Sequence, residues 1–278
     1  MAGVLTPRRR RRSVACMNTN KEVLTTRLRR IQNALGVEAD GLLGPETLTA
    51  LERRLQVEVP HRNISLDCSK AGVALLVAFE IGSRRLYEKR YQRPVWPGGH
   101  SGVTIGIGYD LGMTSRNEIR ADWEPLLAEA DLVALLAVQG VTGEPAKRLA
   151  QGISRVVIPL EQAEQVFYTR TAPLYAARTR ATFPGVQKLP PDAQSMMLSL
   201  VYNRGTSVSG PARREMASLQ VLLRRATPDL EQVAREFESM QRLWPGAELA
   251  GLRARRQKEA AVIRGAARRY TADELVRL

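Results

Sequence analysis

The helical spacing of apolar residues is the feature that most limits what this 278-residue chain can fold into. Apolar side chains recur every three or four positions, which places them on one face of an α-helix. Proline or glycine separates the segments with this spacing, as at Pro159 and Gly205. The segments lie near residues 68–81, 115–137, 144–151, 160–180, 191–203, 213–225, 228–242 and 249–266. The sequence therefore predicts a mainly α-helical domain over residues 68–268, with a short C-terminal tail at 269–278.

The stretch Gly102–Asp110 is different, because its apolar residues alternate as they do in a β-strand. One face would carry Val103, Ile105, Ile107 and Tyr109, and the other Thr104, Gly106, Gly108 and Asp110. Glycines in a strand either let a ligand such as a sugar ring approach the backbone or serve a tight bend. A straight strand would hold Thr104 and Asp110 about 20 Å apart. If the two residues act together, the chain must turn at Gly106–Gly108, so we expect a small β-hairpin or strand region here.

Residues 21–58 form a separate block with its own helical spacing and a turn at Asp40–Gly41. Part of this block reads LRRIQNALGVEADGLLGPETLTAL. The motif resembles the peptidoglycan-binding domain family, and the matching positions are Gln32, Leu35, Gly36, Asp40, Gly41, Gly44, Thr47, Ala50 and Leu51. The resemblance implies a small three-helix wall-binding domain. The alternative is a helical hairpin whose glycines serve turns only.

The segments on either side of this block read as connections. Residues 1–20 contain the run Arg8–Arg12 and predict a disordered basic arm, although a nucleic-acid-binding arm is the alternative. Residues 59–67 predict a linker. No apolar segment follows the basic residues of the N-terminus, so the sequence predicts no secretory signal. The longest apolar run is far shorter than the roughly 18 residues that a membrane span needs, and we expect no membrane span.

Charge and residue usage narrow the classes of function. The chain has 44% hydrophobic and 25% charged residues, as in ordinary globular proteins, yet its net charge is +14. Such a surface attracts a polyanion, either nucleic acid, anionic lipid or an anionic wall polymer. Two cysteines, Cys16 and Cys68, and two histidines, His61 and His100, supply neither a disulfide framework nor a metal site. The sequence predicts no metal and no cofactor, and it favours carboxylate chemistry.

Glu80 is the first candidate for that chemistry. It follows the apolar run 71–79, which predicts a buried helix, and Gly82 ends that helix. Burial and the negative end of the helix dipole both disfavour an ionised carboxylate, which suits a general acid. The alternative is a surface glutamate paired with Arg84 or Arg85.

Two stretches, FEIGSRRLY and GVTIGIGYDLG, together resemble the active-site region of the phage-type lysozymes. Later stretches support the resemblance over residues 70–265, namely FPG (183–185), SLVYNRG (199–205), RREM (213–216) and GLRARRQKEA (251–260). The resemblance implies an α+β lysozyme-like domain with Glu80 and Thr104 in the catalytic triad. In T-even phage lysozymes the triad Asp precedes the Thr by six residues, where this chain has Gly98. Asp110 instead follows Thr104 by six residues, an arrangement similar to that of pesticin, a bacteriocin with a lysozyme-like domain. Glu88 is the alternative to Asp110 as the second carboxylate.

The resemblance implies a muramidase that cleaves the β-1,4 bond between N-acetylmuramic acid and N-acetylglucosamine. Glu80 would be the general acid, and Asp110 and Thr104 would position water. A carboxyl separation of roughly 6.5–9.5 Å would indicate inversion, and about 5–5.5 Å retention. The candidate substrate-binding residues are Gly106, Gly108, His100, Asn203 and Arg204. Two alternatives stay open: a lytic transglycosylase, which needs one catalytic glutamate, and a non-catalytic basic protein that binds wall polymer or nucleic acid.

These expectations fix the partner and the place of action. The partner would be peptidoglycan, through its glycan strands and stem peptides, with no nucleic acid and with the chain a monomer. The chain would be made in the cytoplasm and would act in the periplasm or cell wall. It would reach the wall through a holin, as a phage endolysin does, or through a secretion system, as a delivered toxin does. The resemblance to phage lysozymes favours the endolysin.

Overall fold

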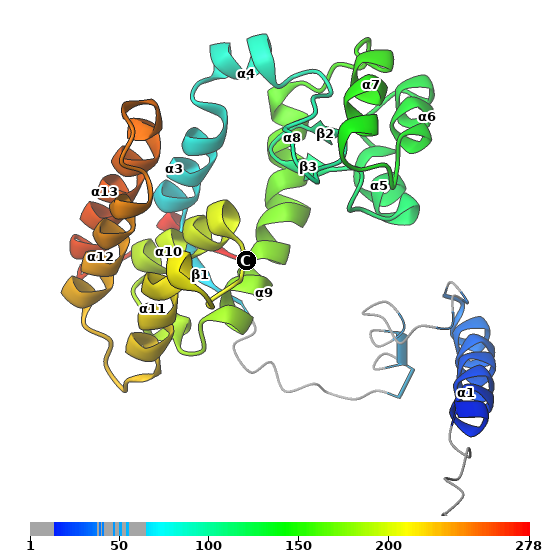
Figure 1. The fold of residues 1–278 in the computed structure, drawn as a ribbon, viewed down its shortest axis with the longest axis horizontal. Helices are drawn as coiled ribbons and strands as arrows, with labels where there is room; N and C mark the ends of the chain where they lie inside the picture. The colour runs from blue at the N-terminus through cyan, green and yellow to red at the C-terminus, as the bar shows by residue number, and fades with distance from the viewer. Residues whose placement is uncertain are drawn as a thin grey trace, which may run out of the picture. The chain divides into compact units, whose positions relative to one another are not determined.

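The computed structural model describes residues 14–37, 39, 41, 47, 50–51, 54–55 and 65–278. The chain divides into two compact units, Met1–Arg62 and Asn63–Leu278, which are described one at a time (Figure 1). Residues 1–13 of the expected basic arm and most of the expected linker lie outside the described residues. Asp40 and Gly44 of the wall-binding motif, and His61, also lie outside them.

In the first unit, helix α1 (Val14–Leu35) begins before the expected end of the basic arm, so residues 14–20 are helical. It ends just before Gly36, which has a positive φ of 71° as expected for a glycine that terminates a helix. The buried Gln32 connects α1 to two other positions of the motif. Its side-chain amide donates to Thr47 Oγ1 at 2.9 Å, and its carbonyl oxygen accepts from the Gly41 N–H at 2.8 Å. These three motif positions therefore have a structural role within the unit.

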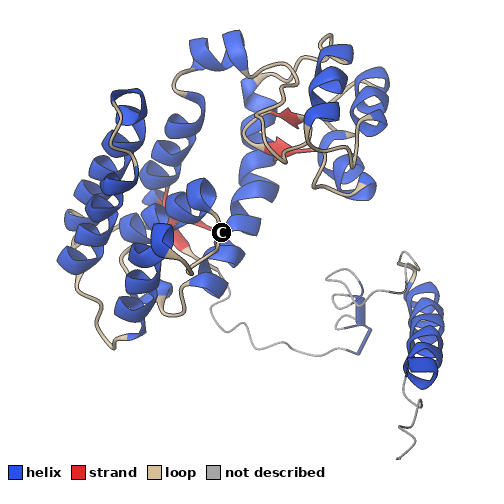
Figure 2. Ribbon diagram, in the orientation of Figure 1, coloured by secondary structure: helices blue, strands red, loops and turns tan. Residues whose placement is uncertain are grey.

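The second unit is mainly helical with a small hairpin sheet, β2–β3, as the sequence predicts, and it has a second two-stranded sheet, β1–β4, that was not expected (Figure 2). Its first helices are α3 (Lys70–Ile81), α4 (Arg84–Arg90), α5 (Arg116–Trp123), α6 (Glu129–Ala137) and α7 (Glu144–Gly152). They are followed by α8 (Leu160–Val166), α9 (Ala172–Thr182), α10 (Pro191–Arg204), α11 (Arg214–Arg224), α12 (Leu230–Ser239) and α13 (Ala250–Arg264). The segment expected as one helix over 115–137 is two helices, α5 and α6, and α4 was not expected. None of the described helices is both long and apolar enough to cross a membrane.

A long helical segment joins the two ends of this unit. Helix α8 continues through a π-helical turn, Phe167–Thr171, into α9, and the residues at both junctions have right-handed helical backbone angles. In Figure 1, α5, α6 and α7 lie with the small sheet β2–β3 at one end of the segment. Helices α10–α13 lie at the other end, where α10 packs against α3 and α13.

The contact between α3 and α10 is close because Gly72 has no side chain. A Cβ atom at Gly72 would lie 2.4 Å from Cβ of Ser195 on α10, a distance that real structures do not allow. Ser69 begins α3 by accepting a hydrogen bond from the Gly72 N–H at 3.0 Å. Its own N–H donates to Ser195 Oγ at 3.0 Å. These contacts fix the start of the helix that carries Glu80 near its other end.

The alternating stretch forms a hairpin rather than one straight strand. Strands β2 (Thr104–Ile105) and β3 (Tyr109–Asp110) pair antiparallel, with Thr104 opposite Asp110. The predicted turn at Gly106–Gly108 is confirmed, and both glycines have positive φ, 57° and 68°. The predicted apolar face is buried, and its members are Val103, Ile105, Ile107 and Tyr109.

The second sheet joins the beginning and the end of the unit. Strand β1 (Asp67–Ser69) pairs antiparallel with β4 (Leu275–Arg277). Leu66 and Leu278 extend the pairing, because each N–H donates to the carbonyl of the other, at 2.7 and 2.9 Å. The last residues, which the sequence placed in a tail, are therefore part of the fold of this unit.

Candidate functional site

Glu80 lies in the last turn of α3 and meets an arginine from far along the chain. Its side chain is 27% exposed, and Arg255 Nη1 of α13 donates to Glu80 Oε1 at 2.7 Å. Glu80 therefore pairs with Arg255 and not with Arg84 or Arg85, the alternative considered above. Arg84 instead pairs with Glu88 and Glu161. Glu80 is therefore ion-paired and partly exposed, whereas the sequence argument took it as a buried carboxyl group at a helix end.

Arg255 belongs to a group of polar and charged residues that we call the α13 cluster: the half-buried Glu80 and the buried Ser199, Arg255, Arg256 and Glu259. Glu259 is fully buried between the two arginines, with Arg255 Nε 3.2 Å from Oε1 and Arg256 Nε 2.9 Å from Oε2. The Ser199 hydroxyl donates to Glu259 Oε1 at 2.6 Å. Burial raises the pKa of Glu259 and lowers the pKa of Arg256 to about 10. The two carboxylates and two guanidiniums are equal in number, so the cluster holds Glu80 without a formal charge imbalance.

Asp110 is held by backbone groups of its own neighbourhood. The Gly102 N–H lies 3.1 Å from both carboxylate oxygens, and the Gly112 N–H donates to Oδ1 at 2.8 Å. Thr104, directly opposite Asp110, donates its hydroxyl to the Gly102 carbonyl at 3.4 Å. The hairpin therefore brings the two expected catalytic residues together, with both half-buried.

Tyr202 of α10 links the hairpin to Glu80, and the sequence argument gave it no role. Its hydroxyl donates to the Ile107 carbonyl in the hairpin turn at 3.0 Å. Burial, and next the negative charge of Glu80, raise the pKa of Tyr202 well above its usual value. The same tyrosine thus lies against the hairpin and within the electrostatic reach of Glu80. The signal that could have found it is its place in the VYNRG motif, immediately before Asn203.

The two hairpin glycines have packing roles. A Cβ atom at Gly108 would lie 2.2 Å from the Tyr202 hydroxyl oxygen, and one at Gly106 would lie 3.1 Å from Cβ of Ala163 on α8. Together with their positive φ, these contacts favour the alternative in which the glycines serve the bend. Gly108 is exposed and also lines a pocket described below.

The other expected site residues lie in different places. His100 is exposed in the turn 98–101, and Asn203 is exposed and accepts from Arg256 Nη2 at 3.3 Å. Arg204 donates to the Ala212 carbonyl at 2.6 Å and lies over the Trp244 ring, 5.2 Å from its centroid. Glu88, the fallback carboxylate, is exposed and 3.8 Å from Arg84. Of these four residues, Asn203 is the one that is hydrogen-bonded to the α13 cluster.

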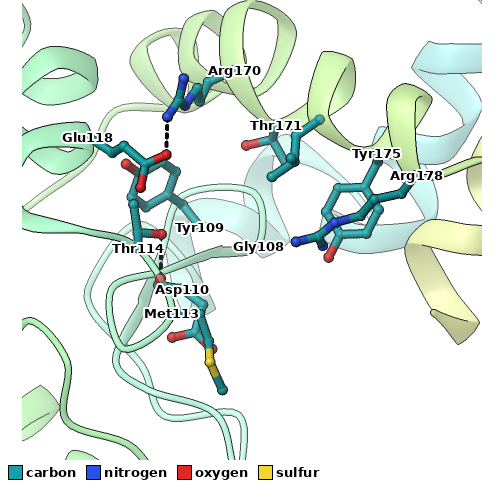
Figure 3. Close-up of a pocket in the computed structure, with 11 residues that line it drawn as sticks. Gly108, Tyr109, Asp110, Met113, Thr114, Glu118, Arg170, Thr171, Tyr175 and Arg178 are labelled. Atoms are coloured by element: carbon teal, nitrogen blue, oxygen red, sulfur yellow. Dashed lines mark hydrogen bonds and ion pairs between the residues drawn. The ribbon is translucent and has the colours of Figure 1, made fainter. Parts of the chain in front are cut away.

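An open pocket of about 120 Å³ lies between the hairpin, α5 and α9 (Figure 3). Gly108 and Asp110 line it, together with Glu118 of α5, Arg170 of the π-helical turn and Arg178 of α9. Burial opposes ionisation of Glu118, but hydrogen bonds from Ser115 and the charge of Arg170 outweigh it and lower the pKa of Glu118. Among the residues that the structure describes, no group of three or more His, Cys, Asp and Glu side chains could hold a metal ion.

The residues that sequence reasoning missed differ in whether the sequence carries a signal for them. Arg255 and Arg256 stand in the motif GLRARRQKEA, which was noticed without a role for either arginine. Their i,i+4 and i,i+3 spacing to Glu259 is a readable signal for paired charges on a helix. Arg178 has no such motif, and only the folded chain brings it beside the hairpin.

Comparison with known protein families gives a match for part of the chain. Residues 77–181 match a protein family described as a domain of unknown function, DUF8812. The matched residues contain Glu80, the hairpin and every residue that lines the pocket, and they stop before α10–α13. No curated protein matches the chain.

Proposed function

We propose that this chain is a peptidoglycan hydrolase of the muramidase type, which cleaves the glycan between N-acetylmuramic acid and N-acetylglucosamine. Glu80 protonates the leaving oxygen, and Asp110 and Thr104 position the attacking water. The N-terminal unit binds the cell wall, and the net charge of +14 adds a salt-sensitive attraction to anionic wall polymers. On this proposal the chain acts in the periplasm or cell wall, either as an endolysin or as a delivered toxin.

One observation carries the proposal: Thr104 and Asp110 face each other on a hairpin whose turn is bonded to Tyr202, and the charge of Glu80 acts on that tyrosine. A hydroxyl and a carboxylate on the hairpin and a second carboxylate on α3 are thus related through one tyrosine of α10. Glycoside hydrolysis needs such a pair of carboxyl groups on the two sides of the scissile bond. This arrangement supports the proposal better than any single residue does.

The surroundings of Glu80 define how it would work. Its 27% exposure gives a substrate oxygen access to the carboxyl group. As a general acid it must carry a proton when the glycosidic bond breaks, and Arg255 lies within hydrogen-bond distance of its carboxyl group. Arg255 also bonds Glu259, so this arginine has a second carboxylate to neutralise when Glu80 is protonated.

A lytic transglycosylase is the second candidate, and the bonds of Asp110 favour it. Both Asp110 oxygens already accept backbone N–H groups, which is a structural use of the carboxylate. A transglycosylase would need only Glu80 and would leave an anhydro sugar. The two candidates therefore differ in whether Asp110 takes part in the reaction.

Product analysis on purified peptidoglycan tests both candidates. The enzymes compared are the wild type, Glu80→Gln, Asp110→Asn and the surface control Glu88→Gln, with folding checked by circular dichroism. We expect Glu80→Gln to lower the rate by about 10²–10⁴-fold, the contribution of a general acid, and Glu88→Gln to have no effect. Reducing muramic acid ends that are lost in both site variants support the muramidase.

Two other outcomes would redirect the proposal. Anhydro ends that persist with Asp110→Asn would favour the transglycosylase. No released fragment from the wild type would contradict both enzymatic candidates and leave a non-catalytic basic wall-binding protein. Full activity of Glu80→Gln would exclude Glu80 as the general acid.

A further inference from the structure

The pocket beside β3 combines an apolar entrance with aromatic and charged walls. Met113, after the hairpin, and Leu174, on α9, both line it and are 69% and 48% exposed. Single exposed apolar side chains are normal on a protein surface, but here two of them line the same opening. Tyr109 and Tyr175 add aromatic surface. The pocket thus suits a ligand with small apolar groups.

The charges of the pocket are satisfied with one exception. Arg170 is bonded to Glu118 and lies 3.4 Å from Asp122, so its charge is neutralised within the protein. The Asp110 carboxylate accepts backbone N–H groups. Arg178 is exposed, and its guanidinium makes no hydrogen bond or ion pair with any residue that the structure describes. It therefore remains available to an anion.

The Arg178 side chain nevertheless has a restricted conformation. Its guanidinium lies over the Tyr175 ring, 4.9 Å from the centroid, which restricts its rotamers. In Figure 3 it reaches across Tyr175 toward Gly108 at the edge of the hairpin. A planar guanidinium held in this way can bind a carboxylate through two parallel hydrogen bonds.

We propose that this pocket binds the stem peptide of the glycan substrate, with Arg178 bonded to a peptide carboxylate and Met113 and Leu174 against its methyl groups. The inference rests on the proposed function and names the part of the substrate that this second site takes. The stem peptide begins at the lactyl group of muramic acid and carries alanyl methyl groups and a glutamyl α-carboxylate. The pocket is lined by Gly108 and Asp110 of the hairpin, so on the proposed function a peptide in it would lie beside the candidate catalytic Asp110.

A pair of soluble probes that differ by one charge tests the pocket without catalysis. Both are muramyl tripeptides with a C-terminal amide; one has a free glutamyl α-carboxylate and the other a carboxamide at that position. Binding to the full chain is followed by NMR titration. We expect the wild type to prefer the carboxylate probe by about tenfold, as for a charged hydrogen bond.

Two arginine variants make the test specific. Arg178→Gln is expected to remove the preference and bind both probes equally. The control Arg148→Gln, which removes an exposed arginine on α7 outside the pocket, is expected to keep it. Equal binding of the two probes by the wild type, no binding of either, or a preference that survives Arg178→Gln would overturn the inference. Because these are binding measurements, they separate its failure from a failure of the hydrolase proposal, which the fragment analysis reports.

Discussion

The two carboxylates of the candidate site are held in opposite ways. Glu80 is bonded to Arg255, a side chain 175 residues further along the chain, whereas Asp110 is bonded to the backbone of Gly102 and Gly112. The position of Glu80 therefore depends on the docking of α13 against α3 and α10. The position of Asp110 depends on one hairpin. Substitutions should accordingly affect the two carboxylates through different parts of the fold.

The largest effect is expected from Glu259→Gln in the α13 cluster. Without this carboxylate, Arg255 and Arg256 stay buried with one charge too many, and breaking such a buried pair costs about 3–5 kcal/mol. We expect the free energy of unfolding to fall by about that amount in urea titrations. The exposed Glu88→Gln should change it by about 1 kcal/mol or less. Similar small losses for both would show that the cluster does not stabilise the fold.

A smaller and more local effect is expected from Asp110→Ala. The Gly102 and Gly112 N–H groups would lose their acceptor, at a cost of about 1–3 kcal/mol. Hydrogen exchange should accelerate at these two amides, while the amides of α13 keep their protection. Faster exchange over the whole chain would contradict the local role of Asp110.

The smallest expected effect is on the pH dependence of the free energy of unfolding. Glu118, beside the hairpin, and Glu259, in the α13 cluster, contribute to it with opposite signs. The lowered pKa of Glu118 means that its stabilisation is present above about pH 4.5 and is lost as the pH falls. The raised pKa of Glu259 has the opposite consequence, because its folded form binds a proton more readily than its unfolded form. We expect Glu118→Gln to flatten the loss of unfolding free energy between pH 5 and pH 3, measured by urea titration. If the unfolding free energy of Glu118→Gln fell with pH as in the wild type, or if the control Glu124→Gln flattened it equally, the stabilising role of the Glu118 carboxylate would be contradicted.

The sequence predicts a helix well where a buried apolar run lies between residues that begin and end helices. Helix α3 has a serine at its start, a glycine after its end and a buried apolar run between them. Helix α4 was missed because its seven residues are mostly charged and only Tyr87 is buried. The pairing of β1 with β4 has no local signal, since three-residue strands cannot show a period and their partners are more than 200 residues apart.

The candidate site could be predicted in part. Alternation with two glycines located the hairpin and the turn that brings Thr104 to Asp110. The partner of Glu80 could not be derived, because the choice between Arg255 and the nearby Arg84 depends on how helices pack. The same is true of Arg178, which enters the pocket only because α9 passes the hairpin.

The β1–β4 pairing has a mechanical consequence. Tension on the chain from the N-terminal side enters this unit at Leu66, where Leu66 and Leu278 bond each other at the end of the ladder. Because Leu66 and Leu278 lie at the same end of an antiparallel ladder, pulling these two ends apart would load the hydrogen bonds one after another from that end. Behind the ladder, Gln194 of α10 accepts from the Asp67 N–H at 3.0 Å and adds a second point of resistance. Force that separates the two ends of this unit would thus act on the β1–β4 pairing before it reached the helix that carries Glu80.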